Sequence, residues 1–198
     1  MQGCHPFVAV QCLYLSHVWQ IRSPCQHKMP LIACIHGGGS TAEIYKSQCA
    51  QLERLLAPDF RLVFFEGPFE HPPGYGILPA FRDYAPFKSW FKKDDMGNEL
   101  SDGSGFDLIG RDGIERLLDL MEKQGDAADY VGAIGFSQGS RVVGGLLLDQ
   151  QRREILGDHR NINLSFGVLC MGSGPPMESE IGHRMFTFIG ASFLARCK

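Results

Sequence analysis

Short apolar runs separated by amphipathic stretches dominate the chain from Leu31 onward. Leu31–Ile35 is continuously apolar and is followed by three glycines, which is typical of a strand buried on both faces. Ser40 or Thr41 can then cap a helix whose apolar positions recur at near-helical spacing until Pro58. Further apolar runs predict strands over residues 60–65, 130–136 and 164–171.

Two longer helices are predicted between the later strands. The first carries apolar residues at i, i+3, i+4 and i+7, namely Ile114, Leu117, Leu118 and Met121, and the second is expected over residues 138–153. Strands that alternate with helices need crossover connections, which make the sheet parallel and place helices on both of its faces. The pattern therefore predicts an α/β fold, and 198 residues are enough for one domain rather than two.

The N-terminal 28 residues show neither helical nor strand periodicity, and the regular pattern begins only at Met29. We interpret residues 1–28 as an irregular arm that precedes the folded domain, which covers residues 29–198. The alternative is that translation starts at Met29 and that the preceding residues are an artefact of the gene model.

The connection over residues 67–106 is long and rich in proline and aromatic residues, and it ends in a polar stretch. A connection of this length in a compact domain usually forms a lid or a pocket wall. The alternative interpretation is that its aromatic side chains only close the top of the hydrophobic core.

Composition and charge narrow the class of protein. The chain has 44% hydrophobic and 21% charged residues, a formal charge of −3 and no basic cluster, so we expect a globular protein without a nucleic-acid partner. No apolar run reaches the ~18 residues of a membrane span, and the N-terminal stretch lacks the features of a signal peptide, so we expect a cytoplasmic protein. The seven cysteines have no zinc-like spacing and are expected to be free thiols, without a metal or another cofactor.

Residues 135–139, Gly-Phe-Ser-Gln-Gly, spell the pattern GxSxG directly after a predicted strand and directly before a predicted helix. The five letters alone are weak evidence, but this context is that of a nucleophile elbow, a sharp turn that exposes a serine hydroxyl. The glycines on either side allow strand and helix to approach closely. We interpret Ser137 as a nucleophile, and the alternative is that it only caps the following helix.

His36 and the glycines that follow it end the first predicted strand. In acyl transfer, backbone N–H groups must stabilise, by hydrogen bonds, the negative charge that develops on the carbonyl oxygen. We expect the N–H groups of Gln138 and of Gly38 or Gly39 to form this oxyanion hole. A phosphate-binding turn is disfavoured because GxGxxG and the Walker lysine are missing, and His36 is interpreted as structural.

An acid and a base for such a serine are not evident after Ser137, where the expected order is Asp or Glu and then His on separate strands. Glu178 or Glu180 with His183 has this order, but the residues are too close together to come from two strands. The other candidates lie on the helix after the serine or in the loop behind it: Asp149, Glu154, Asp158 and His159.

Three separated motifs together resemble the fungal serine hydrolase family, which has the α/β-hydrolase fold. They are IACIHGGGSTAEIY, the stretch FFEGPFEHPPGYGILPAF with the following KSWF, and VGAIGFSQGS, and the resemblance covers residues 29–177. It is nearest to the small members encoded beside polyketide synthases, such as lovastatin-type thioesterases. The resemblance implies that Ser137 is the nucleophile, that the Gly38 turn helps to form the oxyanion hole, and that the aromatic segment lines an acyl pocket.

The resemblance also implies a substrate and a partner. Family members hydrolyse acyl or polyketide esters or thioesters, released from a small molecule or from a carrier domain of a polyketide synthase. We therefore expect an esterase or thioesterase of secondary metabolism.

Family members continue with two further strands, which lead to the aspartate and the histidine of the triad. Residues 185–189 fit the first of these strands, but Gly190, Ala191 and Ser192 stand where an acid is expected and the sequence stops at Lys198. We interpret the domain as C-terminally incomplete, with an exposed sheet edge unless residues 1–28 or a partner chain cover it. The alternative function is a catalytically impaired pseudoenzyme that retains an acyl-binding pocket.

Overall fold

The computed structural model describes residues 10–14, 28–106, 112–125, 127–158 and 162–181. Within these residues the central sheet has five strands in the order β1, β7, β6, β2 and β3. The strands β2 (Leu31–Ile35), β3 (Arg61–Phe65), β6 (Tyr130–Phe136) and β7 (Phe166–Cys170) pair in parallel, and β1 (Val10–Tyr14) is antiparallel to β7. The strands predicted over residues 31–35, 60–65, 130–136 and 164–171 are present, so the α/β class is confirmed.

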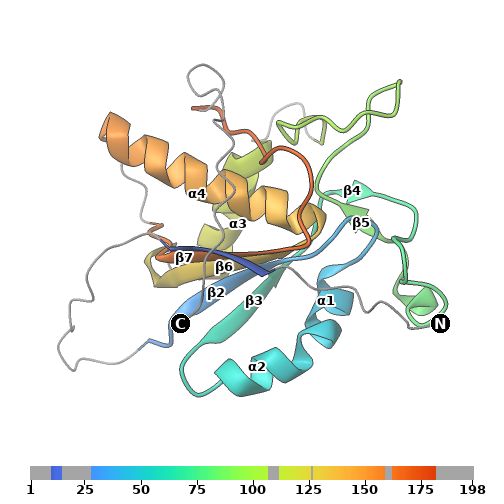
Figure 1. The fold of residues 1–198 in the computed structure, drawn as a ribbon, viewed down its shortest axis with the longest axis horizontal. Helices are drawn as coiled ribbons and strands as arrows, with labels where there is room; N and C mark the ends of the chain where they lie inside the picture. The colour runs from blue at the N-terminus through green and yellow to red at the C-terminus, as the bar shows by residue number, and fades with distance from the viewer. Residues whose placement is uncertain (1–9, 15–27, 107–111, 126, 159–161, 182–198) are drawn as a thin grey trace, which may run out of the picture.

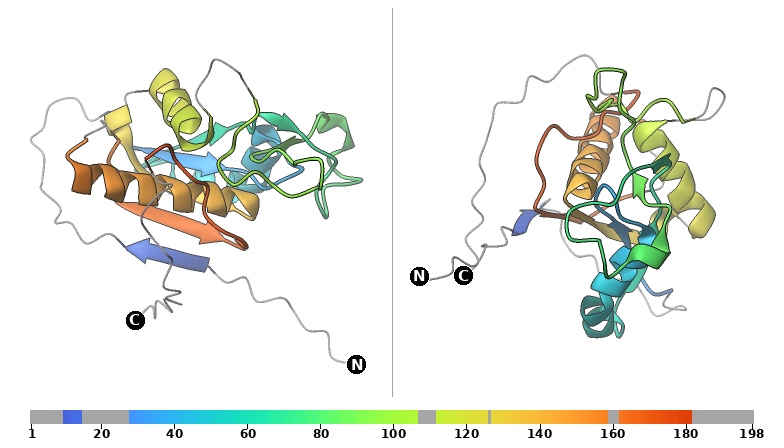
Figure 2. Two further views of the ribbon diagram at one scale, coloured as in Figure 1. Left: turned by 90° about the horizontal axis from the view of Figure 1, so that it is seen from above. Right: turned by 90° about the vertical axis from the view of Figure 1, so that its right-hand side faces the viewer.

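Helices cover both faces of this sheet (Figures 1 and 2). The helices α1 (Ala42–Gln48) and α2 (Ala50–Leu56) lie on one face, and α3 (Gly113–Gln124) and α4 (Gln138–Leu156) lie on the other. Thr41 is the N-cap of α1, since its Oγ1 accepts the Ile44 N–H at 3.1 Å. The single helix expected before Pro58 is two helices, because the backbone leaves helical geometry at Cys49 (φ −88°, ψ 4°).

Side chains of β2 alternate between two hydrophobic clusters. Leu31, Ala33 and Ile35 face the larger cluster with α3 and α4, whereas Ile32 and Cys34 face the smaller cluster with α1. Every residue of β2 is buried, as expected for a central strand with helices on both sides.

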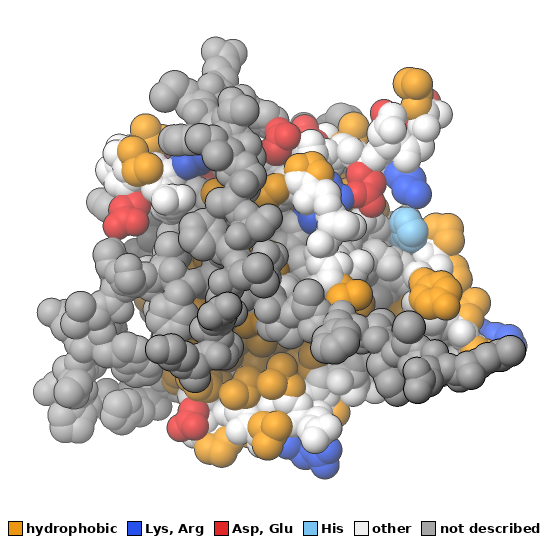
Figure 3. Space-filling model, viewed as in Figure 1, with side chains coloured by type: hydrophobic (Ala, Val, Ile, Leu, Met, Phe, Trp, Pro, Cys, Tyr) orange, Lys and Arg blue, Asp and Glu red, His pale blue; other side chains and the backbone are white. Residues whose placement is uncertain are grey.

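The segment over residues 67–106 contains the short paired strands β4 (Phe69–Glu70) and β5 (Lys88–Ser89) and the 3₁₀ helix η1 (Arg82–Tyr84). Its large apolar side chains differ in burial. Trp90 and Phe91 are buried in the main core, which supports the interpretation that this segment closes the core. Tyr75 and Leu78 are exposed, and Figure 3 shows hydrophobic side chains at the right-hand edge of the molecule, where this part of the chain lies in Figure 1.

The strand β1 differs from the expectation that residues 1–28 are irregular. It pairs with β7 from Val10 opposite Cys170 to Tyr14 opposite Phe166. Residues 10–14, Val-Gln-Cys-Leu-Tyr, neither alternate cleanly nor form a continuous apolar run, and their conformation is set by the neighbouring strand. The arm therefore covers the edge of β7 that would otherwise be exposed. The domain limits at residues 28 and 29 stay a prediction.

A buried ion-pair cluster joins α3 to α4. The Arg153 guanidinium lies 2.7 Å from Asp149, 3.0 Å from Glu115 and 2.7 Å from the more exposed Asp158. Asp149 and Glu115 are almost completely buried, so each depends on Arg153 for its charge balance. Burial raises the pKa of the Glu115 carboxyl above its ordinary value.

We expect Arg153→Met to destabilise the protein, because it leaves the Asp149 and Glu115 carboxylates buried without a counter-charge. Breaking such a pair on one side costs about 3–5 kcal/mol, to be measured by urea unfolding. The exposed Arg54 of α2 is the control, and Arg54→Met is expected to change stability by less than about 0.5 kcal/mol. Equal effects of the two substitutions would contradict the buried-cluster interpretation.

The raised pKa of Glu115 predicts a pH dependence of stability. The folded protein binds a proton at Glu115 more readily than the unfolded chain does, so this residue lowers stability as pH rises above its ordinary pKa of 4.5. Glu115→Gln removes this dependence. The free energy of unfolding of the variant minus that of the wild type is therefore expected to be larger at pH 7 than at pH 4. Urea unfolding at both pH values tests this, with the exposed Glu122→Gln on the same helix as the control. A relative stability that falls over this interval would show that the sign is wrong.

Candidate active site

Ser137 stands in a sharp turn between β6 and α4. Its backbone angles are φ 51° and ψ −116°, in a region that costs a non-glycine residue about 1–3 kcal/mol. The Ser137 N–H donates to the Cys170 carbonyl at 2.7 Å, and Ser140 Oγ lies 2.9 Å from the Gly135 carbonyl oxygen and 2.8 Å from that of Cys170. These contacts with β6 and β7 hold the turn in its strained conformation.

The side chain of Ser137 makes no capping hydrogen bond to α4, although the residue occupies the N-cap position. The alternative role as a plain helix cap is therefore not supported. Ser137 is partly exposed at the carboxyl end of the sheet.

The two glycines of the GxSxG pattern are required by close backbone contacts. A Cβ atom on Gly139 would lie 2.2 Å from the Ile35 carbonyl oxygen, and a Cβ atom on Gly135 would lie 2.3 Å from the Gly139 carbonyl oxygen. Neither position can hold a side chain without moving the backbone. The start of α4 is thus pressed against the end of β2 and against the end of its own preceding strand.

The glycine turn after β2 lies against the serine turn. A Cβ atom on Gly37 would lie 3.3 Å from Ser137 Cβ, and one on Gly38 would lie 3.2 Å from the side-chain amide of Gln138. The Gly39 N–H is already used, since it donates to the Lys88 carbonyl at 2.8 Å. Of the two glycines considered as oxyanion donors, Gly38 is the one that stays a candidate, together with Gln138.

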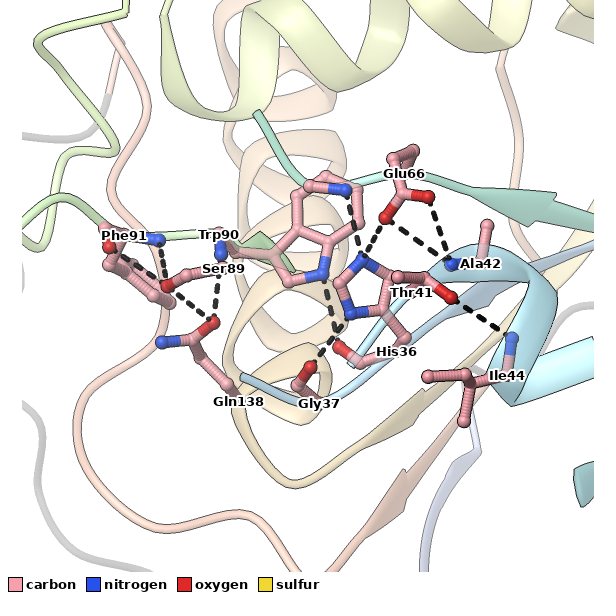
Figure 4. A network of polar contacts seen from close by, with 11 residues as sticks. His36, Gly37, Thr41, Ala42, Ile44, Glu66, Ser89, Trp90, Phe91 and Gln138 are labelled. Carbon is pink, nitrogen blue, oxygen red and sulfur yellow. Dashed lines mark hydrogen bonds and ion pairs between the residues drawn. The ribbon is translucent and has the colours of Figure 1, made fainter. Parts of the chain in front are cut away.

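His36 supports the glycine turn from the interior (Figure 4). The side chain is completely buried, with Nδ1 2.7 Å from the Gly37 carbonyl oxygen and Nε2 2.9 Å from the Gly67 nitrogen. Glu66 Oε1 lies 3.0 Å from the same Nε2, and Glu66 also accepts the Ala42 N–H at the start of α1. This buried arrangement supports the structural role expected for His36.

Three of the acids that follow Ser137 are bonded elsewhere. Asp149 and Asp158 pair with Arg153, and Glu178 accepts a hydrogen bond from Ser101 Oγ at 3.0 Å. Among the described residues, no histidine or carboxylate is hydrogen-bonded to Ser137 Oγ. The candidates His159 and His183 and the strand expected over 185–189 lie outside the described residues.

The three cysteines that the described residues show as free, Cys34, Cys49 and Cys170, are poor alternatives as nucleophiles. Burial raises the pKa of each thiol, so the reactive thiolate is disfavoured at neutral pH. Cys170 is next to the serine turn, and its backbone carbonyl accepts the Ser137 N–H. A serine nucleophile is therefore favoured at this end of the sheet.

Sequence reasoning missed the residues that surround Gln138. The Gln138 side chain contacts Ser89, Trp90 and Glu99, which lie 39 to 49 positions earlier in the chain. The only signal available was the resemblance of the aromatic segment to the family, which does not specify a hydrogen bond.

The chain belongs to the serine hydrolase family described as "Serine hydrolase (FSH1)", which it matches over residues 26–191. This match, together with the parallel sheet and the serine turn, confirms the resemblance noted from the three motifs. Among the described residues, no helix is both long and apolar enough to cross a membrane.

Several curated fungal proteins are similar to this chain. They include "Esterase GME11355" of Pestalotiopsis microspora (37% identity, 78% of this chain and 58% of that protein) and "Probable esterase tazC" of Aspergillus terreus (36%, 76% and 57%). "Esterase FUS5" of Gibberella moniliformis is 35% identical, over 74% of this chain and 58% of that protein. The chain thus spans a little over half the length of these relatives.

We expect Gly139→Ala to destabilise the protein, because the new methyl group would overlap the Ile35 carbonyl oxygen. Overpacking of this kind costs about 1–3 kcal/mol or more. Gly144, also in α4, is the matched control, since a Cβ atom there would meet Pro176 at an ordinary 3.5 Å. Gly144→Ala is expected to be neutral or to stabilise by up to about 1 kcal/mol. Thermal unfolding compares the two, and a Gly139→Ala variant as stable as Gly144→Ala would contradict the close contact.

Proposed function

We propose that this protein hydrolyses an acyl ester or thioester through a covalent acyl-enzyme on Ser137. The observation that carries the proposal is the strained turn of Ser137, which lies against the glycine turn of residues 37–39. In the proposed site, these two turns supply the hydroxyl and the two backbone N–H groups that acyl transfer needs.

In the proposed reaction, Ser137 Oγ attacks the acyl carbonyl carbon and transfers its proton to a base. The carbonyl oxygen becomes an oxyanion, which accepts hydrogen bonds from the N–H groups of Gly38 and Gln138. Collapse of this intermediate expels the alcohol or thiol, which takes up the proton, and water then hydrolyses the acyl-enzyme by the same steps. Each oxyanion donor contributes about 10²–10³ in rate.

Exposed apolar side chains next to the serine support an acyl substrate. Phe136 precedes Ser137 and is 41% exposed, and Met171 follows β7 and is 48% exposed. The relatives are named as esterases, which supports an esterase, and the resemblance to polyketide-associated hydrolases supports a polyketide ester or thioester as substrate. A carrier domain of a polyketide synthase is the corresponding proposed partner.

A fluorophosphonate probe tests the proposal, because it phosphonylates a serine only where the hydroxyl is activated. We expect the wild type to be labelled and Ser137→Ala to lose all labelling. The exposed Ser47 of α1 is the control, and Ser47→Ala is expected to be labelled like the wild type. A folded wild type that is not labelled, or a Ser137→Ala variant that is labelled equally, would overturn the assignment.

The second candidate function is an acyl-binding protein with impaired catalysis. It is favoured by the observation that, within the described part of the chain, no histidine is hydrogen-bonded to Ser137 Oγ. Loss of a triad member lowers turnover by up to about 10⁶ while binding is retained. Undetectable hydrolysis of p-nitrophenyl esters by both the wild type and Ser137→Ala, with retained ligand binding, would favour this function over the first.

A further inference from the structure

Trp90 connects the two sides of the serine site (Figure 4). Its indole Nε1–H donates to the His36 carbonyl at 3.0 Å, and its backbone N–H donates to Gln138 Oε1 at 2.8 Å. His36 immediately precedes the glycine turn, and Gln138 immediately follows Ser137. One buried residue thus holds both backbone segments that would supply the oxyanion donors.

The Gln138 side chain is fixed between the glycine turn and β5. Its amide lies beneath Gly38, where a Cβ atom would be 3.2 Å from the amide carbon, nitrogen and oxygen alike. Besides the Trp90 N–H, Oε1 lies 3.1 Å from Ser89 Oγ, and Nε2 donates to Glu99 Oε1 at 2.8 Å. The side chain therefore contacts both the Gly38 backbone and β5, which the glycine turn also meets directly through the Gly39 N–H bond to the Lys88 carbonyl.

The orientation of the Gln138 amide is determined by its partners. The Glu99 carboxylate can only accept, so it requires Nε2, and the Trp90 N–H can only donate, so it requires Oε1. Glu99 is itself held by an ion pair with Arg141, whose guanidinium stacks 3.9 Å from the centre of the Phe91 ring. Arg141 also donates from Nε to the Pro175 carbonyl at 2.7 Å. A flipped amide would lose both of its principal hydrogen bonds.

We propose that Trp90 and the side chain of Gln138 are positioning residues that hold the Gly38 and Gln138 N–H groups at the separation an oxyanion requires. This inference rests on the proposed function, because it assigns a purpose to the geometry of the same site. Preorganised donors stabilise a developing charge only while they stay aligned, and a misplacement of about 1 Å can lower the rate by about 10²-fold. We call Trp90 and the Gln138 side chain the clamp. Its loss is therefore expected to lower kcat and to leave KM largely unchanged.

The first test compares two glutamines of the same helix. In α4, Gln150 accepts the Leu164 N–H at 2.7 Å through Oε1, a bond of the same kind as that from Trp90 to Gln138, but its other side-chain contacts are Asn163 and the Leu164 carbonyl. We expect Gln138→Met to lower kcat for a p-nitrophenyl ester about 10- to 100-fold with KM within about 2-fold. Gln150→Met is expected to retain the wild-type kcat even where its thermal stability falls to the same extent.

The second test uses the pH profile. In Gln138→Glu an acceptor oxygen stays available to the Trp90 N–H, but the new carboxylate faces Glu99 and can donate to it only when protonated. The ratio of variant to wild-type kcat is therefore expected to rise as pH falls. A residue with a purely structural role would change stability without the pH dependence expected for Gln138→Glu.

Trp90→Phe removes the donor to the His36 carbonyl and is expected to lower kcat with KM little changed.

The outcomes separate the two proposals. A wild type that hydrolyses the ester, with Gln138→Met and Gln150→Met changing kcat equally or not at all, overturns the clamp alone. A wild type that neither hydrolyses the ester nor reacts with the fluorophosphonate probe overturns the proposed function and the clamp with it. If Gln138→Met does not fold, the isosteric Gln138→Glu decides, and a kcat ratio that is flat with pH counts against the clamp.

Discussion

The contact between the start of α4 and the end of β2 is the constraint on which the site depends. Gly139 approaches the Ile35 carbonyl so closely that no side chain fits between them, and Gly135 is equally close to Gly139. Because the helix must begin at that distance from the sheet, the chain can enter it only through a sharp turn at Ser137. The same approach brings residues 137 and 138 against the glycine turn, so one steric requirement locates both the hydroxyl and the amides.

In the segment over residues 67–106, one residue both packs in the hydrophobic core and contacts the proposed site. The ring of Trp90 belongs to the main hydrophobic core, whereas its two N–H groups face the two halves of the site. The core fixes the position of the indole ring, and the ring N–H is therefore fixed as well. Residues of the segment that close the core thus also support the proposed oxyanion hole, whereas its role as a lid or pocket wall stays a prediction.

Local patterns predicted the parts of the fold that depend on neighbouring residues. The strands β2 and β6, the helix α3 and the turn at Ser137 each follow from the order of apolar residues and glycines within about ten positions. Features that depend on distant partners were missed: the strand β1, which forms on β7, and the cluster around Arg153. The break at Cys49 was missed as well, since the apolar spacing continues across it. The proposed nucleophile was accessible from the motif, but its hydrogen-bonded surroundings were not.

The pairing of β1 with β7 links the N-terminal part of the chain to the serine turn. Cys170 is opposite Val10 at this sheet edge, and its carbonyl oxygen accepts the Ser137 N–H. Transient separation of the edge strand would loosen the strand that anchors the elbow, so we expect the opening of β1 to lower the protection of the Ser137 amide against hydrogen exchange. An affinity tag or fusion partner placed just ahead of Val10 would thus lie next to the strand that contains Cys170. A tag that displaces β1 is expected to change the anchoring of Ser137 as well as the solubility of the protein.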